Sequence, residues 1–399
     1  KQIVILGGGV GGTLAANLLV RRLKNNEVRV VVVDENGDHV YQPGFLYVPF
    51  GWERVEALVR EERRLLDRRV ELVVDRATGV DTDKNRVELA SGRQLDYDYL
   101  VIATGSHPDP DLVPGLAAAG HHFYTREAAL RLGQALENLE GGRVVIGVAG
   151  LPYKCPVAPL EFTFLLDWYL RRKGIRDSFK LEYVSPLPRA FPIQTVSDQV
   201  TPWLADKEVE LTIFFNVESV DPGQRVVASL EGEERPFDLL VMIPPHRGAQ
   251  FLIDSGLAPA PGGWVPTDRY TLKAEGYENI YVLGDATNLP VSKSGSAAHF
   301  QADPLVENLV AELRGERPEH AYDGHVMCFL EAGFNRATLL DFDYRNPPYP
   351  PPPSVALHLA KIAFNKAYWW TLPQGRLPNR PVKPRIFLGC SFELRVLVP

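Results

Sequence analysis

The sequence predicts an α/β fold made of two halves that alternate strands and helices, followed by an amphipathic C-terminal segment. Three observations predict it. Residues 1–34 read as strand, glycine-rich turn, helix and strand, and a second strand–turn–helix order begins near residue 142. Residues 354–378 then place apolar and aromatic side chains at helical spacing. A chain of 399 residues, 45% of them hydrophobic, is long enough for two or three domains.

Composition and charge argue against several classes of protein. The formal net charge of −7 is spread along the chain without a basic stripe, so nucleic acid is not an expected partner. The three cysteines, Cys155, Cys328 and Cys390, are too few for a disulfide-stapled secreted scaffold. No apolar run approaches the roughly 18–20 residues of a membrane-spanning helix.

The first segment carries a dinucleotide-binding turn of the Rossmann type. Gly7, Gly9 and Gly12 form the pattern G-x-G-x-x-G between a predicted strand and a predicted helix. Gly7 permits the tight turn, Gly9 lets the backbone approach a pyrophosphate, and Gly12 allows close helix packing. The helix N-terminus offers free N–H groups to the phosphates. Asp34, at the end of the next strand, can accept hydrogen bonds from a ribose.

Two later segments indicate which dinucleotide binds. "LDYDYLVIATGSHP" runs into Ala103-Thr104-Gly105, and "ENIYVLGDATNLP" ends in Gly284-Asp285-Ala286. Both resemble the paired motifs of two-dinucleotide-domain flavoproteins, the disulfide-reductase-like family. The resemblance implies FAD, with Ala103, Thr104, Gly105 and Gly284 at its site and Asp285 on the flavin ribityl chain.

The order of these motifs predicts three parts. Residues 1–111 and 251–315 form the FAD-binding domain, and residues 112–250 form a second Rossmann-like domain inserted into it. Residues 316–399 form a C-terminal part with a cysteine-bearing hairpin and the amphipathic segment.

The turn of the second half, "GVAGLPYKC", does not suit a nicotinamide cofactor. Alignment on Gly147 places Ala149 and Pro152 where glycines are needed, and proline stiffens the turn and lacks an N–H. The next strand ends in "VSP", without an acidic residue for a ribose or an arginine for a 2′-phosphate. The second half is therefore predicted to have no nicotinamide site.

The same turn carries a candidate reactive thiol. Pro156 suits the first helical position, which predicts Cys155 at the N-cap beside Lys154. The positive end of the helix and the lysine would both lower the thiol pKa. An inert buried cysteine is the alternative. Cys328 lies in a predicted hairpin closed around "AGFN", where a core role is natural, and Cys390 has no chemical group beside it.

Four segments together resemble the sulfide:quinone oxidoreductase group, whose pattern flavocytochrome c sulfide dehydrogenases partly share. They are "YKCPVAPLEF", the "PPH" turn at 244–246, "SKSGSAAHFQA" at 292–302 and the hairpin with Cys328. The resemblance implies that Cys155 and Cys328 form a redox pair beside the flavin. It also implies oxidation of sulfide to polysulfide or sulfane sulfur, with electrons passed to a membrane quinone.

The resemblance extends to further residues. Glu161 would accept a proton near the redox pair, with a surface helix carboxylate as the alternative. Gln42 and Pro43 would lie in the loop against the flavin ring, and Lys293 would place positive charge near it. A third cysteine found in some members, in the segment between the two halves, is absent from "GLAAAGHHFYTREAAL".

Residues 354–378 suggest a helix that lies in a membrane interface. Lysines beside interfacial aromatic residues suit the headgroup region, whereas packing on the core or at a dimer interface is the alternative. The resemblance implies that Lys366 and Tyr368 line a quinone pocket. We expect a peripheral membrane protein, more naturally on the cytoplasmic than the periplasmic face, and a homo-oligomer is compatible with the sequence.

Two other functions remain open from the sequence. One is the flavoprotein of a cytochrome-coupled sulfide dehydrogenase, against which the aromatic and basic C-terminal segment argues. The other is a type II NADH:quinone oxidoreductase, which needs the missing second glycine motif. A non-catalytic flavoprotein would leave the Lys-Cys-Pro helix start unexplained.

Overall fold

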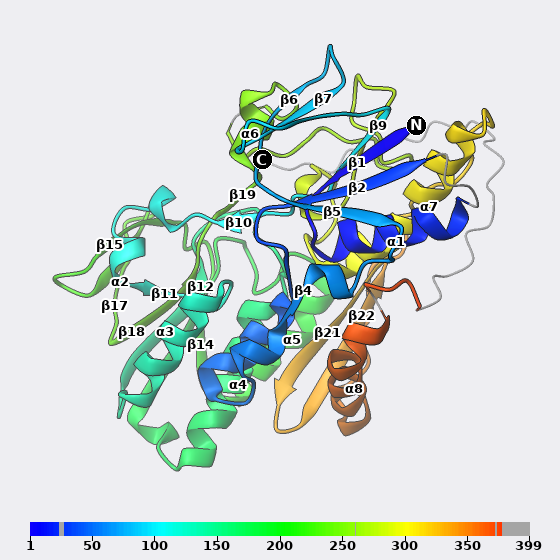
Figure 1. Cartoon of the computed structure of the whole chain (residues 1–399). Helices are drawn as coiled ribbons and strands as arrows, with labels where there is room; N and C mark the ends of the chain where they lie inside the picture. Colours follow the sequence, from blue (N-terminus) through cyan, green and yellow to red (C-terminus); the bar gives the residue numbers. More distant parts are fainter. Residues whose placement is uncertain (24–27, 260, 372, 377–399) are drawn as a thin grey trace.

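The computed structural model describes residues 1–23, 28–259, 261–371 and 373–376 (Figure 1). Cys390 lies outside the described residues. Two five-stranded parallel sheets, one in each half, form the framework. Their strands are almost continuous runs of valine, isoleucine and leucine, because helices or small sheets cover both faces.

The first sheet has the strand order β20-β9-β1-β2-β5. These strands are β1 (Gln2–Leu6), β2 (Arg29–Asp34), β5 (Val70–Val74), β9 (Tyr99–Ile102) and β20 (Ile280–Val282). Helices α1 (Val10–Arg22) and α7 (Gly295–Leu313) pack together beside it, as Figure 1 shows. The short helix α6 (Gln250–Asp254) and a small sheet of β6 (Ala77–Asp81), β7 (Arg86–Leu89) and β8 (Gln94–Asp96) lie elsewhere in this half.

The second sheet has the order β11-β18-β12-β13-β14. Its strands are β11 (Gly120–His121), β12 (Gly142–Val148), β13 (Phe179–Val184), β14 (Val209–Thr212) and β18 (Leu239–Ile243). The helices of this half are α2 (Leu116–Ala119), α3 (Arg126–Glu137), α4 (Ala158–Lys173) and α5 (Gln194–Asp206). A second small sheet contains β15 (Val217–Asp221), β16 (Val226–Ser229) and β17 (Glu234–Pro236), so the two halves repeat one plan.

The chain passes between the halves twice, at two short strands that pair with each other. These are β10 (His107–Pro108) and β19 (His246–Arg247), which run antiparallel. The remaining short elements are β3 (Asp38–Val40), β4 (Val59–Glu61) and the 3-10 helices η1 (Gln42–Phe50), η2 (Val55–Leu58), η3 (Glu62–Arg64), η4 (Pro110–Leu112), η5 (Arg176–Ser178) and η6 (Gly284–Ala286). The predicted α/β class with two Rossmann-like halves is confirmed.

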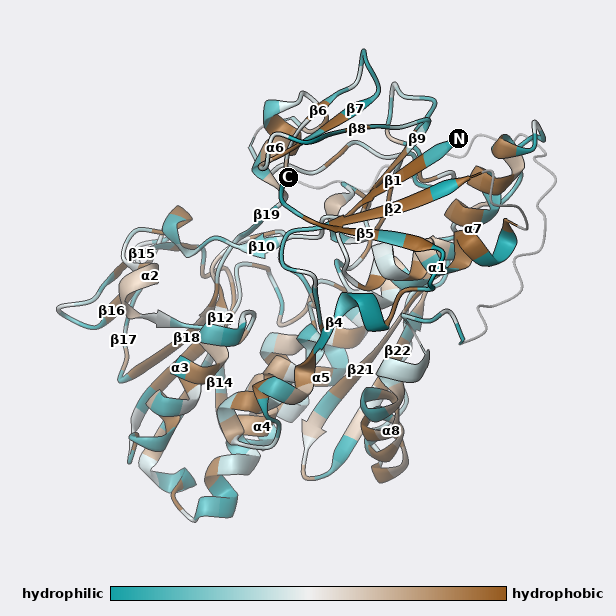
Figure 2. Cartoon of the chain, in the orientation of Figure 1, coloured by the Kyte–Doolittle hydropathy of each residue, from teal (hydrophilic) through white to brown (hydrophobic). Residues whose placement is uncertain are grey.

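A hairpin and a helix follow the two halves. Strands β21 (Val326–Gly333) and β22 (Arg336–Phe342) turn through Phe334 and Asn335, both left-handed, and β21 packs against α4. Helix α8 (Val355–Thr371) packs on β22 and is largely brown in Figure 2. It ends earlier than the predicted segment, since a turn follows at residues 373–375. None of the helices in the described parts of the chain has the length and apolar character to cross a bilayer.

Candidate functional site

The glycine-rich turn between β1 and α1 is held by close backbone packing. Gly7 has φ +103°, and a Cβ there would lie 2.5 Å from the Ala103 carbonyl oxygen. A Cβ on Gly12 would lie 1.9 Å from the Gly7 oxygen. Gly9 differs, because no atom lies within 4 Å of its Cβ position. The backbone at Gly9 therefore borders open space at the start of α1, where a phosphate can approach.

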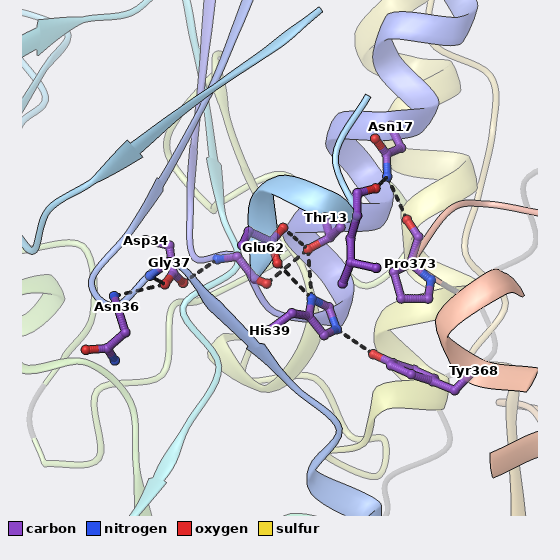
Figure 3. A network of polar contacts seen from close by, with 11 residues as sticks. Thr13, Asn17, Asp34, Asn36, Gly37, His39, Glu62, Tyr368 and Pro373 are labelled. Atoms are coloured by element: carbon purple, nitrogen blue, oxygen red, sulfur yellow. Dashed lines mark hydrogen bonds and ion pairs between the residues drawn. The ribbon is translucent and has the colours of Figure 1, made fainter. Parts of the chain in front are cut away.

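Asp34 ends β2 and organises the adjacent loop. Its Oδ2 accepts a hydrogen bond from the Gly8 N–H at 2.8 Å, and its Oδ1 accepts from Asn36 and Gly37 at 3.0 and 2.8 Å. Figure 3 shows the contacts of Asp34 with Asn36 and Gly37 at the left of the view. The carboxylate thus stands beside the glycine turn, at the carboxyl end of a parallel strand, where ligands bind in open α/β sheets.

The two later motifs meet in space beside the first. Ala103 follows β9, and its N–H donates to the Leu6 oxygen at 2.8 Å. The Thr104 hydroxyl is buried with no hydrogen-bond partner among the described residues. Gly105 has φ +69° and an open Cβ position. On the second motif, the Gly284 N–H donates to Gln301 at 2.6 Å.

Asp285 faces the segment that follows the first motif. Its Oδ2 accepts from the Ser106 hydroxyl at 3.0 Å, and the Lys154 ammonium donates to the Ser106 carbonyl at 2.9 Å. Burial lowers the pKa of Lys154, which the nearby Asp285 charge opposes. The FAD-type motifs and the loop that carries Cys155 therefore share one site.

Lys293 anchors that loop to the first half. The Cys155 N–H donates to the Lys293 carbonyl at 2.7 Å, and Lys154 pairs with Lys293 as an isolated β-bridge. The Lys293 ammonium donates to the Asp285 and Thr287 carbonyls at 2.9 and 2.7 Å. Burial lowers its pKa to about 8, opposed by Asp285.

The predicted position and pKa of Cys155 are wrong. Helix α4 has Val157 at its N-cap, while Cys155 lies two residues earlier in a left-handed conformation with φ +52°. The Lys154 ammonium points to Ser106 and not to the thiol. Burial raises the pKa of Cys155, and charge on Glu161 and on Cys328 raises it further. The apolar surroundings therefore have a larger effect on the Cys155 pKa than the helix terminus has.

Cys328 comes from β21 and lies at the same place. Both thiols are free and partly buried, and both border the hydrophobic core cluster that contains α4. Burial is the larger cause and the Glu161 charge the smaller cause that raise the pKa of Cys328 to about 12. The predicted pair thus comes together from a loop of the second half and from the C-terminal hairpin.

Glu161 is buried, and not a surface carboxylate. Its Oε1 accepts the Glu331 N–H at 2.8 Å and forms a buried ion pair with Lys361 of α8. Burial raises the pKa of the Glu161 carboxyl, and Lys361 offsets this only in part. The sequence pattern placed Lys361 with Lys366 at the membrane interface, which is wrong for Lys361, because its side chain is buried against Glu161. Its position seven residues before the inward-facing Tyr368, within the apolar "HLAKIAF", was the available signal.

The turn of the second half differs in length from the first. Strand β1 and helix α1 are separated by residues 7–9, whereas β12 and α4 are separated by residues 149–157. A Cβ on Gly147 would lie 2.4 Å from the Val184 oxygen, so this glycine serves strand packing. The helix N-terminus does not directly follow its strand, as a dinucleotide turn requires.

The remaining predicted residues lie in two environments. Gln42 and Pro43 are exposed at the start of η1, and Lys366 is exposed on α8. Tyr368 is buried, and its hydroxyl meets Nε2 of His39 at 2.6 Å (Figure 3). Lys366 and Tyr368 therefore point in different directions from α8, and the structure does not bring them together.

Known proteins match most of the chain. A family model described as pyridine nucleotide-disulphide oxidoreductase matches residues 1–302. The chain belongs to this family. The sulfide:quinone oxidoreductase of Dictyostelium discoideum is 29% identical over 94% of the chain and 86% of its own length. The mouse mitochondrial enzyme of the same name is 27% identical over 93% of the chain and 86% of its length. The predicted resemblance to this group of the family is confirmed.

A solved structure of another sulfide:quinone oxidoreductase has the same fold as this chain. The sulfide:quinone oxidoreductase of Aquifex aeolicus superimposes with a TM-score of 0.84, covering 94% of this chain and 92% of that one at 24% identity. FAD is the cofactor of this oxidoreductase family. The open position at Gly9, the unpartnered Thr104 hydroxyl and the open Gly105 all fit such a group.

Proposed function

We propose that this protein oxidises sulfide to polysulfide or sulfane sulfur and reduces a membrane quinone, using FAD. The observation that supports it best is the convergence of Cys155, Cys328 and the buried Glu161 on the site of the FAD motifs. The names of the relatives agree with this assignment. No other pair of cysteines exists among the described residues.

In the proposed reaction the chain works with a disulfide between Cys155 and Cys328. Hydrosulfide attacks one sulfur and breaks the S–S bond, so one cysteine becomes a persulfide and the other a thiolate. When bound, FAD would supply a two-electron acceptor between the sulfur and the quinone. By resemblance, Cys328 is the thiolate. Glu161, whose pKa burial raises, takes up the proton of the persulfide.

The cofactor would be held by the residues of the first half. The turn at Gly7, Gly9 and Gly12, with the N-terminus of α1, would receive the pyrophosphate. Asp34 would stand at the ribose and Asp285 at the ribityl chain. Gln42, Pro43, Lys293 and the strand end at residues 103–105 would border the flavin.

We further propose that α8 rests on the bilayer surface. Its exposed side chains include Val355, Leu359 and Trp370, which are 46%, 57% and 60% exposed, with Lys366 beside them. Apolar and aromatic side chains with a lysine suit the headgroup region. The quinone would enter beside this helix, with Lys366 at the entrance, and the cytoplasmic face of the membrane is the proposed side.

An anaerobic titration of the purified holoprotein tests the function. We expect sulfide to bleach the flavin stoichiometrically and NADH or NADPH to leave it oxidised, because the second turn lacks a dinucleotide geometry. Addition of a quinone should restore the oxidised spectrum. Rapid bleaching by micromolar NADH, or none by sulfide, would overturn the proposal. Reoxidation by a cytochrome but not by any quinone would favour the cytochrome-coupled alternative.

A further inference from the structure

A chain of buried polar groups runs from the cysteines to the surface of α8. It contains Glu161 of α4, Lys361 of α8, Tyr47 of η1, Glu331 of β21 and His358 of α8. Glu161, Glu331 and Lys361 are buried residues. Burial of a polar group costs free energy unless the group is hydrogen-bonded, so a buried cluster of this kind is expected to be hydrogen-bonded throughout.

The members of this chain are hydrogen-bonded or ion-paired to one another, except that Lys361 and Tyr47 only lie close together. The Lys361 ammonium pairs with Glu161 and lies near the Tyr47 ring, 5.7 Å from its centroid. The Lys361 charge acts on the Tyr47 hydroxyl and opposes the rise in its pKa that burial causes. That hydroxyl donates to Glu331 Oε1 at 3.1 Å, and His358 Nδ1 lies 3.0 Å from Glu331 Oε2.

The two ends differ in what they reach. Glu161 lies close enough to Cys155 and Cys328 for its charge to raise the pKa of both thiols. His358 retains 13% exposure of its side chain, whereas the Glu331 side chain retains 1%. The Glu161 end of the chain therefore lies near the two cysteines, and the His358 end reaches the surface beside the exposed face of α8.

Burial and neighbouring charges set the pKa values of the titratable groups in and around this chain. Burial raises the pKa of Glu161, and although burial opposes the charge on Lys361, the Glu161 carboxylate raises the Lys361 pKa above its usual range. Burial also raises the pKa of Tyr47, which Lys361 opposes. Tyr41, Cys155 and Cys328 are titratable neighbours of both Glu161 and Lys361, and Tyr124 also feels the Glu161 charge.

We propose that Glu161, Lys361, Tyr47, Glu331 and His358 form a proton relay between the redox cysteines and the surface beside α8. The proposal rests on the sulfide-oxidising function proposed above. Glu161 lies near enough to the cysteines for its charge to act on both thiols, whereas the other four are positioning and relay residues. A purely structural ion cluster that fastens α8 to the hairpin is the competing explanation.

The transfer balances in protons and charge. The persulfide S–H gives its proton to the Glu161 carboxylate, leaving a persulfide anion and a neutral carboxyl. Lys361 gives a proton through the Tyr47 hydroxyl to Glu331 and takes one back from Glu161. Glu331 passes its proton to His358, which releases it to water. Each group then stands in its starting state, and one proton has moved from sulfur to solvent.

The sharpest test compares Tyr47→Phe with Tyr41→Phe in the FAD-loaded protein. Both changes remove one phenol oxygen from the same segment, but the Tyr41 hydroxyl donates to Asn365 at 2.5 Å and lies outside the relay. Sulfide is mixed rapidly with each variant without quinone, in H₂O and in D₂O, at several buffer concentrations. A positioned proton donor contributes about 10²–10⁴-fold, and water replaces part of this, so we expect about tenfold slower bleaching for Tyr47→Phe.

Three readouts separate a relay from a structural role. In Tyr47→Phe, bleaching should show a larger solvent isotope effect and should accelerate with buffer concentration. The infrared band of the protonated Glu161 carboxyl should also persist after sulfide is added. Tyr41→Phe should match the wild type in all three. Equal behaviour of the two variants would overturn the relay.

A second pair of variants tests the surface end. His358→Gln should slow bleaching and be rescued by added imidazole, whereas His320→Gln, a matched change in the segment that follows α7, should do neither. Absence of rescue together with normal rates would also overturn the relay. If wild-type protein is not bleached by sulfide at all, the proposed function fails first, which is a different outcome from normal bleaching in Tyr47→Phe.

Discussion

The hydroxyl of Tyr368 lies 2.6 Å from Nε2 of His39, and this contact joins two buried residues that are 329 positions apart. The other ring nitrogen of His39 meets Glu62 at 2.9 Å and the Thr13 hydroxyl at 3.2 Å. Figure 3 shows that the contacts connect α8 with α1, whose first turn begins the FAD site. Helix α8 is therefore fastened to the first half by its C-terminal part.

Removal of this contact should loosen α8. Tyr368→Phe leaves His39 Nε2 buried without its partner, which costs about 1–3 kcal/mol. The thermal unfolding midpoint of the holoprotein should fall by several degrees (about 2–4 °C per kcal/mol in chains of about 150–250 residues). Tyr349→Phe, at a position that is 79% exposed, is the matched control. The same midpoint for both variants would contradict this assignment.

Glycine substitutions should separate packing from cofactor contact. Gly12→Ala drives a methyl group into the Gly7 carbonyl, so we expect poor folding. Gly9→Ala meets no protein atom within 4 Å and should fold normally, yet bind FAD at least about tenfold more weakly. Circular dichroism and the flavin content of purified protein measure the two effects. Full flavin content in Gly9→Ala would show that the phosphates lie elsewhere, and Gly223→Ala serves as control.

Each redox cysteine should be indispensable. Cys155→Ser and Cys328→Ser should retain FAD, because neither side chain belongs to the glycine turn, but sulfide should no longer bleach the flavin. Cys390→Ser controls for loss of a thiol. Near-normal sulfide turnover in either of the first two variants would rule out the paired mechanism.

Alkylation of the reduced protein should report the raised pKa of Cys328. Its pKa of about 12 arises from burial and from Glu161, opposed by Lys361 and a Ser294 hydrogen bond. Only the thiolate reacts, so the iodoacetamide rate should rise about tenfold per pH unit from pH 8 to 10, whereas a free thiol levels off near ~8.5. Glu161→Gln removes the negative charge, lowers the pKa and should accelerate alkylation at a given pH. Exposed Glu316→Gln should not, and a plateau near pH 8 in the parent protein would contradict the burial effect.

Membrane contact is best tested on the surface of α8. Truncation before Ser354 would also remove the buried Lys361 and Tyr368, so surface changes are cleaner. Leu359→Ser with Trp370→Ser should weaken binding to vesicles by about tenfold or more, since burial of a leucine alone contributes roughly 1.5–3 kcal/mol. Leu230→Ser, at a side chain that is 68% exposed in the second half, is the matched control. Unchanged flotation with vesicles would place the membrane contact elsewhere.

The FAD motifs were predictable because each is local. A strand, a glycine turn and a helix follow one another within residues 1–22, and the close contact at Gly12 is with the Gly7 oxygen in the same turn. The position of Cys155 was predicted wrongly because a distant segment decides it. Lys293 holds the Cys155 backbone, and this contact moves the helix start to Ala158.

Buried polar pairs were the other features that local patterns could not predict. Glu161 and Lys361 are 200 positions apart, and each is of a residue type that usually lies at the surface. Tyr368 was expected at a quinone pocket on the strength of resemblance, and its partner His39 carries no local signal. Such pairs form because α4, α8 and the first half pack together. The helical period of one segment does not predict that packing.

The position of β20 beside β9 has a consequence for synthesis of the chain on the ribosome. Strands β1, β2, β5 and β9 are complete by residue 102, but the outer edge of β9 stays unpaired until Ile280–Val282 emerge. At about 5–20 residues per second, the intervening stretch takes on the order of 9–35 s to translate. All strands of the second sheet emerge in that interval. The inserted half is thus complete first, and a nascent chain that stalls before residue 280 presents an open strand edge to its neighbours.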